Sequence, residues 1–230
     1  MTSQSSGGGR LLRRFAADTG GVAMIEFGFV LPIVVLMSLT GAELINYITV
    51  KMRMSQIALT IADNAARMGN GTALAAKTIN ESDVNDVFTG AQLESGGLDL
   101  QKNGRVILSD LEPTAAGAAT YKIKWQRCFG AQTHASTYGT YNQPSGSNMT
   151  GMGPTGRKVT AQDDNATMFV EVYYVYKPLL KASWAPTTTL TEIASMAVRD
   201  RRDLSNDAGS PNPTHPQGIY KVAGVTPSTC

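Results

Sequence analysis

The sequence predicts an α+β protein, in which a long N-terminal helix is followed by a small antiparallel β-sheet domain with a short helix. An apolar run of helical length lies near the N-terminus, and an amphipathic segment follows it without a break. Several β-prone runs, separated by polar connections, occupy the remainder. At 230 residues the chain can hold one membrane helix and one modest domain. We expect a basic leader, a transmembrane helix, an amphipathic helical extension and an α+β domain at residues 1–21, 22–43, 44–70 and 71–230.

The surplus positive charge of this chain lies in the N-terminal leader. Residues 1–9 are small and polar, so we expect them to be disordered. Arg10, Arg13 and Arg14 follow, opposed in the leader by Asp18 alone, whereas the rest of the chain is electrically balanced. That balance gives no electrostatic footprint for nucleic acid. Positive charge before an apolar span favours a cytoplasmic N-terminus, with the C-terminal domain across the membrane.

The apolar run from Val22 to Ala42 contains a single charge, Glu26. Its length is close to the roughly 20 residues that span hydrocarbon. A cleaved secretory signal would need a shorter apolar core and a small-residue cleavage site, whereas helical patterning continues here. A carboxylate in a span costs roughly 2.5–3.5 kcal/mol on insertion scales, which favours a functional role for Glu26. The alternative is a tolerated polar residue near the interface.

A proline and a second glutamate also lie in or at the end of the span. Pro32 is expected to kink the helix, which neighbouring helices can tolerate in a bilayer. Glu43 lies at the far end, where we expect its side chain to extend to water.

The segment after the span predicts an amphipathic extension of the same helix. Apolar residues recur there at helical steps, with charged residues between them. These apolar positions are Leu44, Ile48, Ile57, Ile61, Ala65 and Met68. The helix should end at Gly69-Asn70-Gly71, because glycine and asparagine favour helix termination.

The remaining chain predicts a short helix and four extended segments. Ser82–Phe88 has a capped helical pattern, with Ser82 or Asp83 as N-cap. Alternating or β-branched runs predict strands at Arg105–Leu111, Thr120–Trp125 and Met168–Tyr176. The spacing in Thr189–Arg199 fits neither period cleanly, and we favour a fourth strand over a short helix. The long Gly130–Gly156 connection is of the kind that is usually functional or mobile.

Only two cysteines occur, Cys128 and Cys230. In an oxidising compartment such a pair is most simply one disulfide. It would close a loop of roughly 100 residues, for which the chain-entropy model gives at most about 4.7 kcal/mol. The alternative is two free thiols, with the terminal Cys230 frayed.

The sequence offers little support for catalysis or a cofactor. His134 and His215 have no carboxylate or cysteine at ligand spacing, so we expect no metal site. Asp163-Asp164-Asn165 lacks the glycine and the distal glutamate of a calcium loop. The Arg199–Asp203 run predicts a solvated cluster with weak ion pairs. No Ser/His/Asp set, phosphate-binding glycine loop or dinucleotide fingerprint occurs, so we expect a protein without enzymatic activity or cofactors.

The N-terminal half resembles the TadE-like family, the minor pilins or pseudopilins of bacterial tight-adherence (Flp-type) pilus systems. The resemblance covers residues 10–70 well and the rest loosely. It rests on Arg13-Arg14-Phe15, Gly21-Val22-Ala23-Met24-Ile25-Glu26-Phe27, Leu31-Pro32 and Gly41-Ala42-Glu43-Leu44, with weaker echoes at Trp125-Gln126-Arg127-Cys128 and Val172–Leu179. Valine stands at position 22, where pilin-like proteins more often have phenylalanine or methionine.

The resemblance implies a pilin-like fold and a role in pilus assembly. A prepilin peptidase would cut after Gly21, leaving Val22 as the new N-terminus and the family's glutamate at Glu26. The implied assembly residues are Glu26, Pro32 and Glu43. The implied partners are the bacterial inner membrane, the peptidase, other pilins and the assembly machinery, and the domain would be periplasmic or incorporated into a pilus.

Two other functions compete with this interpretation. One is an unprocessed single-span protein whose periplasmic domain is a binding module, with the Gly130–Gly156 loop contacting a ligand or surface. The other is a membrane-anchored hydrolase, which the scattered polar residues disfavour.

Overall fold

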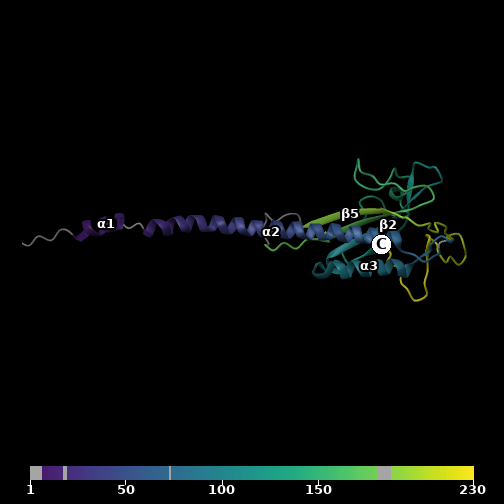
Figure 1. Ribbon diagram of the computed structural model, residues 1–230, viewed down its shortest axis with the longest axis horizontal. Helices are drawn as coiled ribbons and strands as arrows, with labels where there is room; N and C mark the ends of the chain where they lie inside the picture. Colours follow the sequence, from purple (N-terminus) through teal and green to yellow (C-terminus); the bar gives the residue numbers. More distant parts are fainter. Residues whose placement is uncertain (1–6, 18–19, 73, 181–187) are drawn as a thin grey trace, which may run out of the picture.

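The structure, a computed structural model, describes residues 7–17, 20–72, 74–180 and 188–230. A single long helix, α2 (Gly20–Arg67), runs from the N-terminal region into a head built from the rest of the chain (Figure 1). The C-terminus lies on this head. The predicted layout, a long N-terminal apolar helix followed by a small antiparallel sheet with short helices, is therefore confirmed as an α+β arrangement.

A separate helix, α1 (Gly7–Ala17), precedes α2. Our expectation of disorder for residues 1–9 is thus wrong for Gly7–Gly9, and residues 1–6 lie outside the described part of the chain. In an α-helix each amide donates to the carbonyl four residues earlier. The amides of residues 11–13 therefore require the carbonyls of Gly7–Gly9, which draws these glycines into the helix.

The apolar run and the amphipathic segment form one helix, as expected. At 1.5 Å per residue, α2 is about 72 Å long. Pro32 lies inside it, and Figure 1 shows the ribbon continuing through this stretch. The helix ends at Arg67, and Gly69 follows with a φ of +109°, which favours glycine. The predicted stop at Gly69-Asn70-Gly71 is confirmed.

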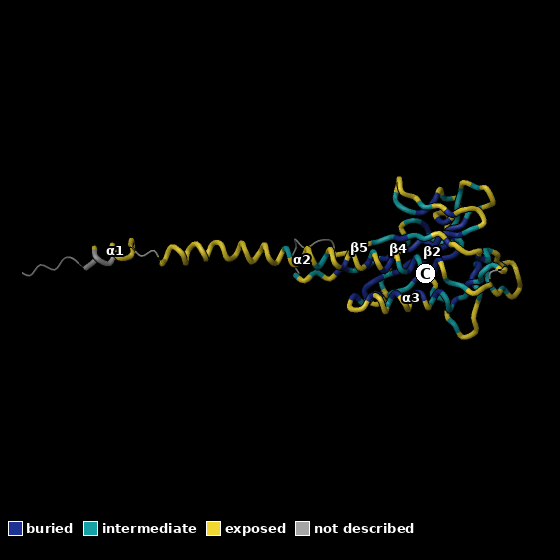
Figure 2. The backbone as a smooth tube through the Cα atoms, in the orientation of Figure 1, coloured by how far each residue is buried: buried dark blue, intermediate teal, exposed yellow. Residues whose placement is uncertain are grey.

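Burial divides α2 into two halves (Figure 2). Residues 20–40 are exposed, whereas the C-terminal half buries a stripe against the head. The buried residues from Val50 on are Val50, Met54, Ile57, Ala58, Ile61, Ala62, Ala65 and Ala66. Leu44 and Ile48, which we expected on the apolar face, are exposed because the buried stripe passes along the neighbouring side of the helix.

The head contains a four-stranded antiparallel sheet in the order β3-β2-β4-β5. Its strands are β2 (Gly104–Pro113), β3 (Tyr121–Phe129), β4 (Thr167–Val175) and β5 (Thr189–Ala197). All four predicted strands are present, and the ambiguous last segment is a strand. A parallel pair, β1 (Ile79–Asn80) with β6 (Ile219–Tyr220), was not predicted.

A register shift in the β2–β3 pair changes the expected alternation. Asp110 pairs with Trp125 and Leu111 with Ile123, so Lys124 is the extra residue of a bulge. Ile123 and Trp125, two residues apart, consequently pack in different clusters on the two faces of the sheet.

The predicted short helix is longer than expected and begins earlier. It is α3 (Glu81–Ser95), and its N-cap is Asn80 rather than Ser82 or Asp83. Asn80 Oδ1 accepts from the Asp83 amide at 2.9 Å, and Asp83 Oδ2 accepts from the Asn80 amide at 3.0 Å. This capping box satisfies two helix-terminal donors at once. Two short turns follow, η1 (Gly96–Leu98) and α4 (Leu100–Asn103).

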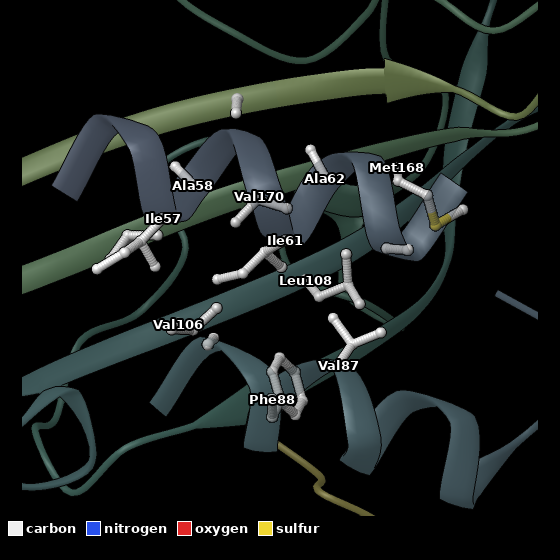
Figure 3. Close-up of a cluster of buried hydrophobic side chains, with 14 of the residues drawn as sticks. Ile57, Ala58, Ile61, Ala62, Val87, Phe88, Val106, Leu108, Met168 and Val170 are labelled. Atoms are coloured by element: carbon white, nitrogen blue, oxygen red, sulfur yellow. The ribbon is translucent and has the colours of Figure 1, made fainter. Parts of the chain in front are cut away.

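Both faces of the sheet are covered. Figure 3 shows side chains from α2, α3, β2 and β4 meeting in one layer, among them Ile61, Phe88 and Leu108. The opposite face carries a smaller cluster around Leu111, Met152 and Phe169. The 130–166 connection, which contains the turn η2 (Pro144–Gly146), contributes Met152 to this second cluster and packs Tyr138, Tyr141, Met149 and Val159 against it.

The Arg199–Asp203 run differs from the solvated cluster that we expected. Arg202 is buried, and its Nη2 donates to the carbonyls of Ala65 and Met68, both at 3.0 Å. The guanidinium therefore satisfies carbonyls at the C-terminal end of α2, where the helix dipole favours positive charge. Asp200 forms an ion pair with Lys77 at 2.6 Å.

Candidate functional site

The predicted cleavage position lies in the first turn of α2. A Cβ atom at Gly21 would meet nothing within 4 Å, so packing in this structure does not require glycine there. Val22 is 54% exposed. The Gly21–Val22 bond thus lies on a helix end that the head does not cover (Figure 2).

Glu26 lies one helical turn after Val22. It is exposed, and no described residue forms a hydrogen bond or ion pair with its side chain. Its neighbours Ile25 and Phe27 are exposed apolar residues. An 18-residue window of this helix reaches a mean hydropathy of 2.3, so α2 is long and apolar enough to cross a membrane.

The helix satisfies some of the other polar groups in the same half and leaves one carbonyl without its helical donor. Pro32 has no amide hydrogen and cannot donate to the carbonyl of Gly28. Ser38 and Thr40 each donate their hydroxyl to the carbonyl four residues earlier, at 2.8 Å. Such internal bonding lets hydroxyls remain in an apolar medium without a partner from water.

Glu43 differs most from expectation. Instead of extending to water, its side chain is only 2% exposed. It accepts hydrogen bonds from the Tyr176 hydroxyl at 2.6 Å and from the amides of Leu179 and Leu180 at 2.8 and 3.1 Å. The physical reason is that the chain leaving β4 passes beside α2 and offers three donors that replace water. We call these four residues, together with Asn46, the Glu43 junction.

The junction is built around the tyrosine. Asn46 Nδ2 donates to the Tyr176 hydroxyl oxygen at 2.7 Å, and Tyr47 meets the Tyr176 ring edge-on with centroids 5.4 Å apart. Burial and the hydrogen bond to the Glu43 carboxylate raise the pKa of Tyr176 to about 12. The phenol therefore stays a donor over the physiological pH range. No local pattern in the sequence predicts that Glu43 contacts Tyr176, which lies 133 positions away.

The disulfide lies in the head, apart from both glutamates. Cys128 in β3 is bonded to Cys230, with their Cα atoms 4.8 Å apart. The Cys128 amide also donates to the Ser228 carbonyl at 2.7 Å. The predicted pairing is confirmed, and the C-terminal residue is tied to the sheet rather than frayed.

A cavity of about 330 Å³ lies beside this disulfide, between the start of the 130–166 connection and the sheet. His134, in its lining, stacks on Tyr173 with ring centroids 4.2 Å apart. Buried Glu171 accepts from the Ser136 hydroxyl and from the Thr137 amide. No residue spacing in the sequence predicts this arrangement.

The histidines do not form a metal centre in the described part of the chain, where no group of three or more His, Cys, Asp or Glu side chains could hold an ion. His215 does have a carboxylate nearby, although we expected none from the residue spacing. Its Nδ1 lies 3.4 Å from Asp207 Oδ2, because the 207–215 turn folds back on itself.

The predicted site residues thus occupy three places. Gly21, Val22 and Glu26 share the exposed end of α2, Glu43 lies at the junction with the head, and the cysteines lie in the head. At 1.5 Å per residue, Glu26 and Glu43 are about 25 Å apart along the helix. Comparison with protein-family models, with curated proteins and with solved structures finds no match to this chain.

Proposed function

We propose that this chain is a membrane-held minor pilin or pseudopilin that assists assembly of a tight-adherence pilus after a prepilin peptidase cuts it behind Gly21. The observation that carries the proposal is the division of α2. One continuous helix is apolar and exposed in its N-terminal half and packed into a folded head in its C-terminal half. Such a helix can lie in lipid first and among other helices later, because its apolar sides pack on either.

The chemistry of the helix end supports the same role. Cleavage would give Val22 a free α-amino group, one helical turn from the carboxylate of Glu26. The carboxylate could pair with this amine or with that of a neighbouring subunit. Either pair offsets part of the cost of burying both charges in an apolar bundle.

The head supports an extracytoplasmic location. Its disulfide is of a kind that persists in oxidising compartments such as the bacterial periplasm. The leader arginines favour a cytoplasmic N-terminus. In this proposal the chain crosses the inner membrane once, uses no cofactor and catalyses no reaction.

Processing is tested by mass spectrometry of the protein extracted from cell membranes. Intact mass should show a chain that begins at Val22, and Gly21→Leu should accumulate the full-length precursor. Gly28→Leu is the matched control, because a Cβ at either glycine meets nothing within 4 Å and neither change disturbs packing. Normal cleavage of Gly21→Leu would count against the proposal.

Assembly is tested separately. Glu26→Ala should be cleaved normally yet fail to support pili, whereas Met24→Ala, two residues away on the same exposed helix, should support them. Wild-type piliation by Glu26→Ala would refute the role of the carboxylate.

The alternative is an unprocessed, membrane-anchored binding module. The cavity between the 130–166 connection and the sheet favours it, because ligand sites are concave. Recovery of the native chain with Met1 and the whole leader would support this alternative over the pilin.

A further inference from the structure

The helix α1 (Gly7–Ala17) is not used by the proposed function, which requires only a basic leader. It is separated from α2 by residues 18 and 19 alone. The Gly21–Val22 bond therefore lies within a few residues of the end of α1, at the N-terminal end of the candidate membrane span.

The helical period divides α1 into two faces. At about 100° per residue, the apolar positions between residues 10 and 16 fall within an arc of about 140°. These positions are Leu11, Leu12, Phe15 and Ala16. The arginine positions 10, 13 and 14 fall within about 100° on the opposite side.

Phe15 and Ala16, the residues of the apolar face whose side chains the structure describes, are both exposed. Phe15 is 77% exposed, and Arg13 and Arg14 are exposed as well. No acidic residue occurs in α1 to neutralise the arginines. An exposed phenylalanine opposite a cluster of arginines is typical of helices that lie in a membrane interface rather than in water.

We propose that α1 lies flat on an anionic phospholipid surface, with its apolar face in the acyl boundary and its arginines at the headgroups. Two features of the chain select lipid as the occupant. The attached span already holds α1 at a membrane, and its positive charge complements acidic headgroups. Docking fixes the depth of the Gly21–Val22 bond at the interface. This consequence, unlike the docking itself, rests on the proposed function.

The docking is tested on the full chain in nanodiscs by amide hydrogen exchange of residues 10–17. We expect exchange to be at least tenfold slower in discs that contain phosphatidylglycerol than in discs of phosphatidylcholine alone. A composition-matched control mixes the two faces through Leu11→Arg, Leu12→Arg, Arg13→Leu and Arg14→Leu, which spreads apolar and arginine positions around the helix and keeps the net charge and the residue content. This variant and Phe15→Ser should lose most of the protection.

Three results would overturn the proposal or its consequence. Equal exchange in both kinds of disc would show that α1 does not dock. Protection of the variant with mixed faces would show that charge alone attracts the leader. A variant that loses protection in discs but is cleaved in cells at the wild-type rate would refute the positioning of the bond. Exchange is measured without a peptidase, so failure of cleavage in cells would refute the pilin proposal and leave the docking intact.

Discussion

The two halves of α2 share one backbone and differ in what surrounds them. The C-terminal half is apolar along one stripe, and the head covers that stripe (Figure 3). The N-terminal half is apolar on all sides, and the head covers none of it (Figure 2). A helix that is hydrophobic all round needs an apolar medium all round, which a membrane or a bundle of helices supplies. The difference shows why one helix can serve both as an anchor and as a structural part of the head.

The two glutamates of α2 repeat this contrast. Glu43 meets three donors from the head, whereas Glu26 meets none from the described residues. A carboxylate that is already satisfied within its own chain has a role in that chain's structure. A carboxylate without a partner among the described residues of an apolar stretch is available to a group from elsewhere, such as the α-amino group that the proposed cleavage would create.

The largest expected effect concerns the end of α2 inside the head. Arg202→Met should lower the free energy of unfolding by about 3–5 kcal/mol, since it removes a buried guanidinium and leaves the carbonyls of Ala65 and Met68 without their donor. Arg201→Met, at an exposed position next to it, should have almost no effect. Denaturant unfolding in detergent, followed by near-UV circular dichroism of buried Trp125, measures both. Equal effects would show that the head does not depend on this contact.

The same substitution in the two halves should give different results. Ile61→Ala leaves a cavity between α2 and the sheet, so we expect a loss of about 2–4 kcal/mol. Ile33→Ala, at a residue that is 59% exposed, should leave the unfolding of the head unchanged within about 0.5 kcal/mol. The same unfolding assay checks the pair. A comparable loss at Ile33 would mean that the N-terminal half also packs against the head.

A smaller effect is expected at the Glu43 junction. Glu43→Gln replaces a charged acceptor that serves three donors, which should cost about 1–3 kcal/mol. Hydrogen exchange should report it locally, as faster exchange of the Leu179 and Leu180 amides. Glu26→Gln should leave these amides unchanged. Unaltered protection in Glu43→Gln would show that the carboxylate does not hold this segment.

Local patterns in the sequence predicted the elements of the fold well. Period and length gave the helix and its end near Gly69, and β-branched or alternating runs gave all four long strands. The α3 boundary was missed because Asn80 caps the helix from a position inside β1. The leader helix was missed because we judged residues 1–9 by their small, polar composition and did not use the helical spacing of Leu11, Leu12 and Phe15.

Contacts between distant parts of the chain were not predictable in this way. Glu43 at the end of an apolar run has the pattern of a side chain that reaches water, and only the path of residues 176–180 gives it other donors. Arg202 lies in a run of charges that resembles a solvated surface, yet it reaches the carbonyls of α2. The disulfide was predictable because two cysteines allow a single pairing.

The smallest expected effect is the pH dependence of stability that Glu171 causes. Like Glu43, Glu171 is a buried carboxylate that accepts from a hydroxyl and a backbone amide. Burial raises the pKa of Glu171, and the hydrogen bonds from Ser136 and Thr137 offset only part of this. The folded protein therefore holds the proton more tightly than the unfolded chain, whose glutamates titrate at a pKa of about 4.3. The stabilisation is complete below that pH and is lost as the pH rises through the pKa of the folded state. Glu171→Gln should remove this dependence, so its stability relative to wild type should increase between pH 4 and pH 7 in urea unfolding. A stability difference that stays constant or falls over this range would contradict the assignment.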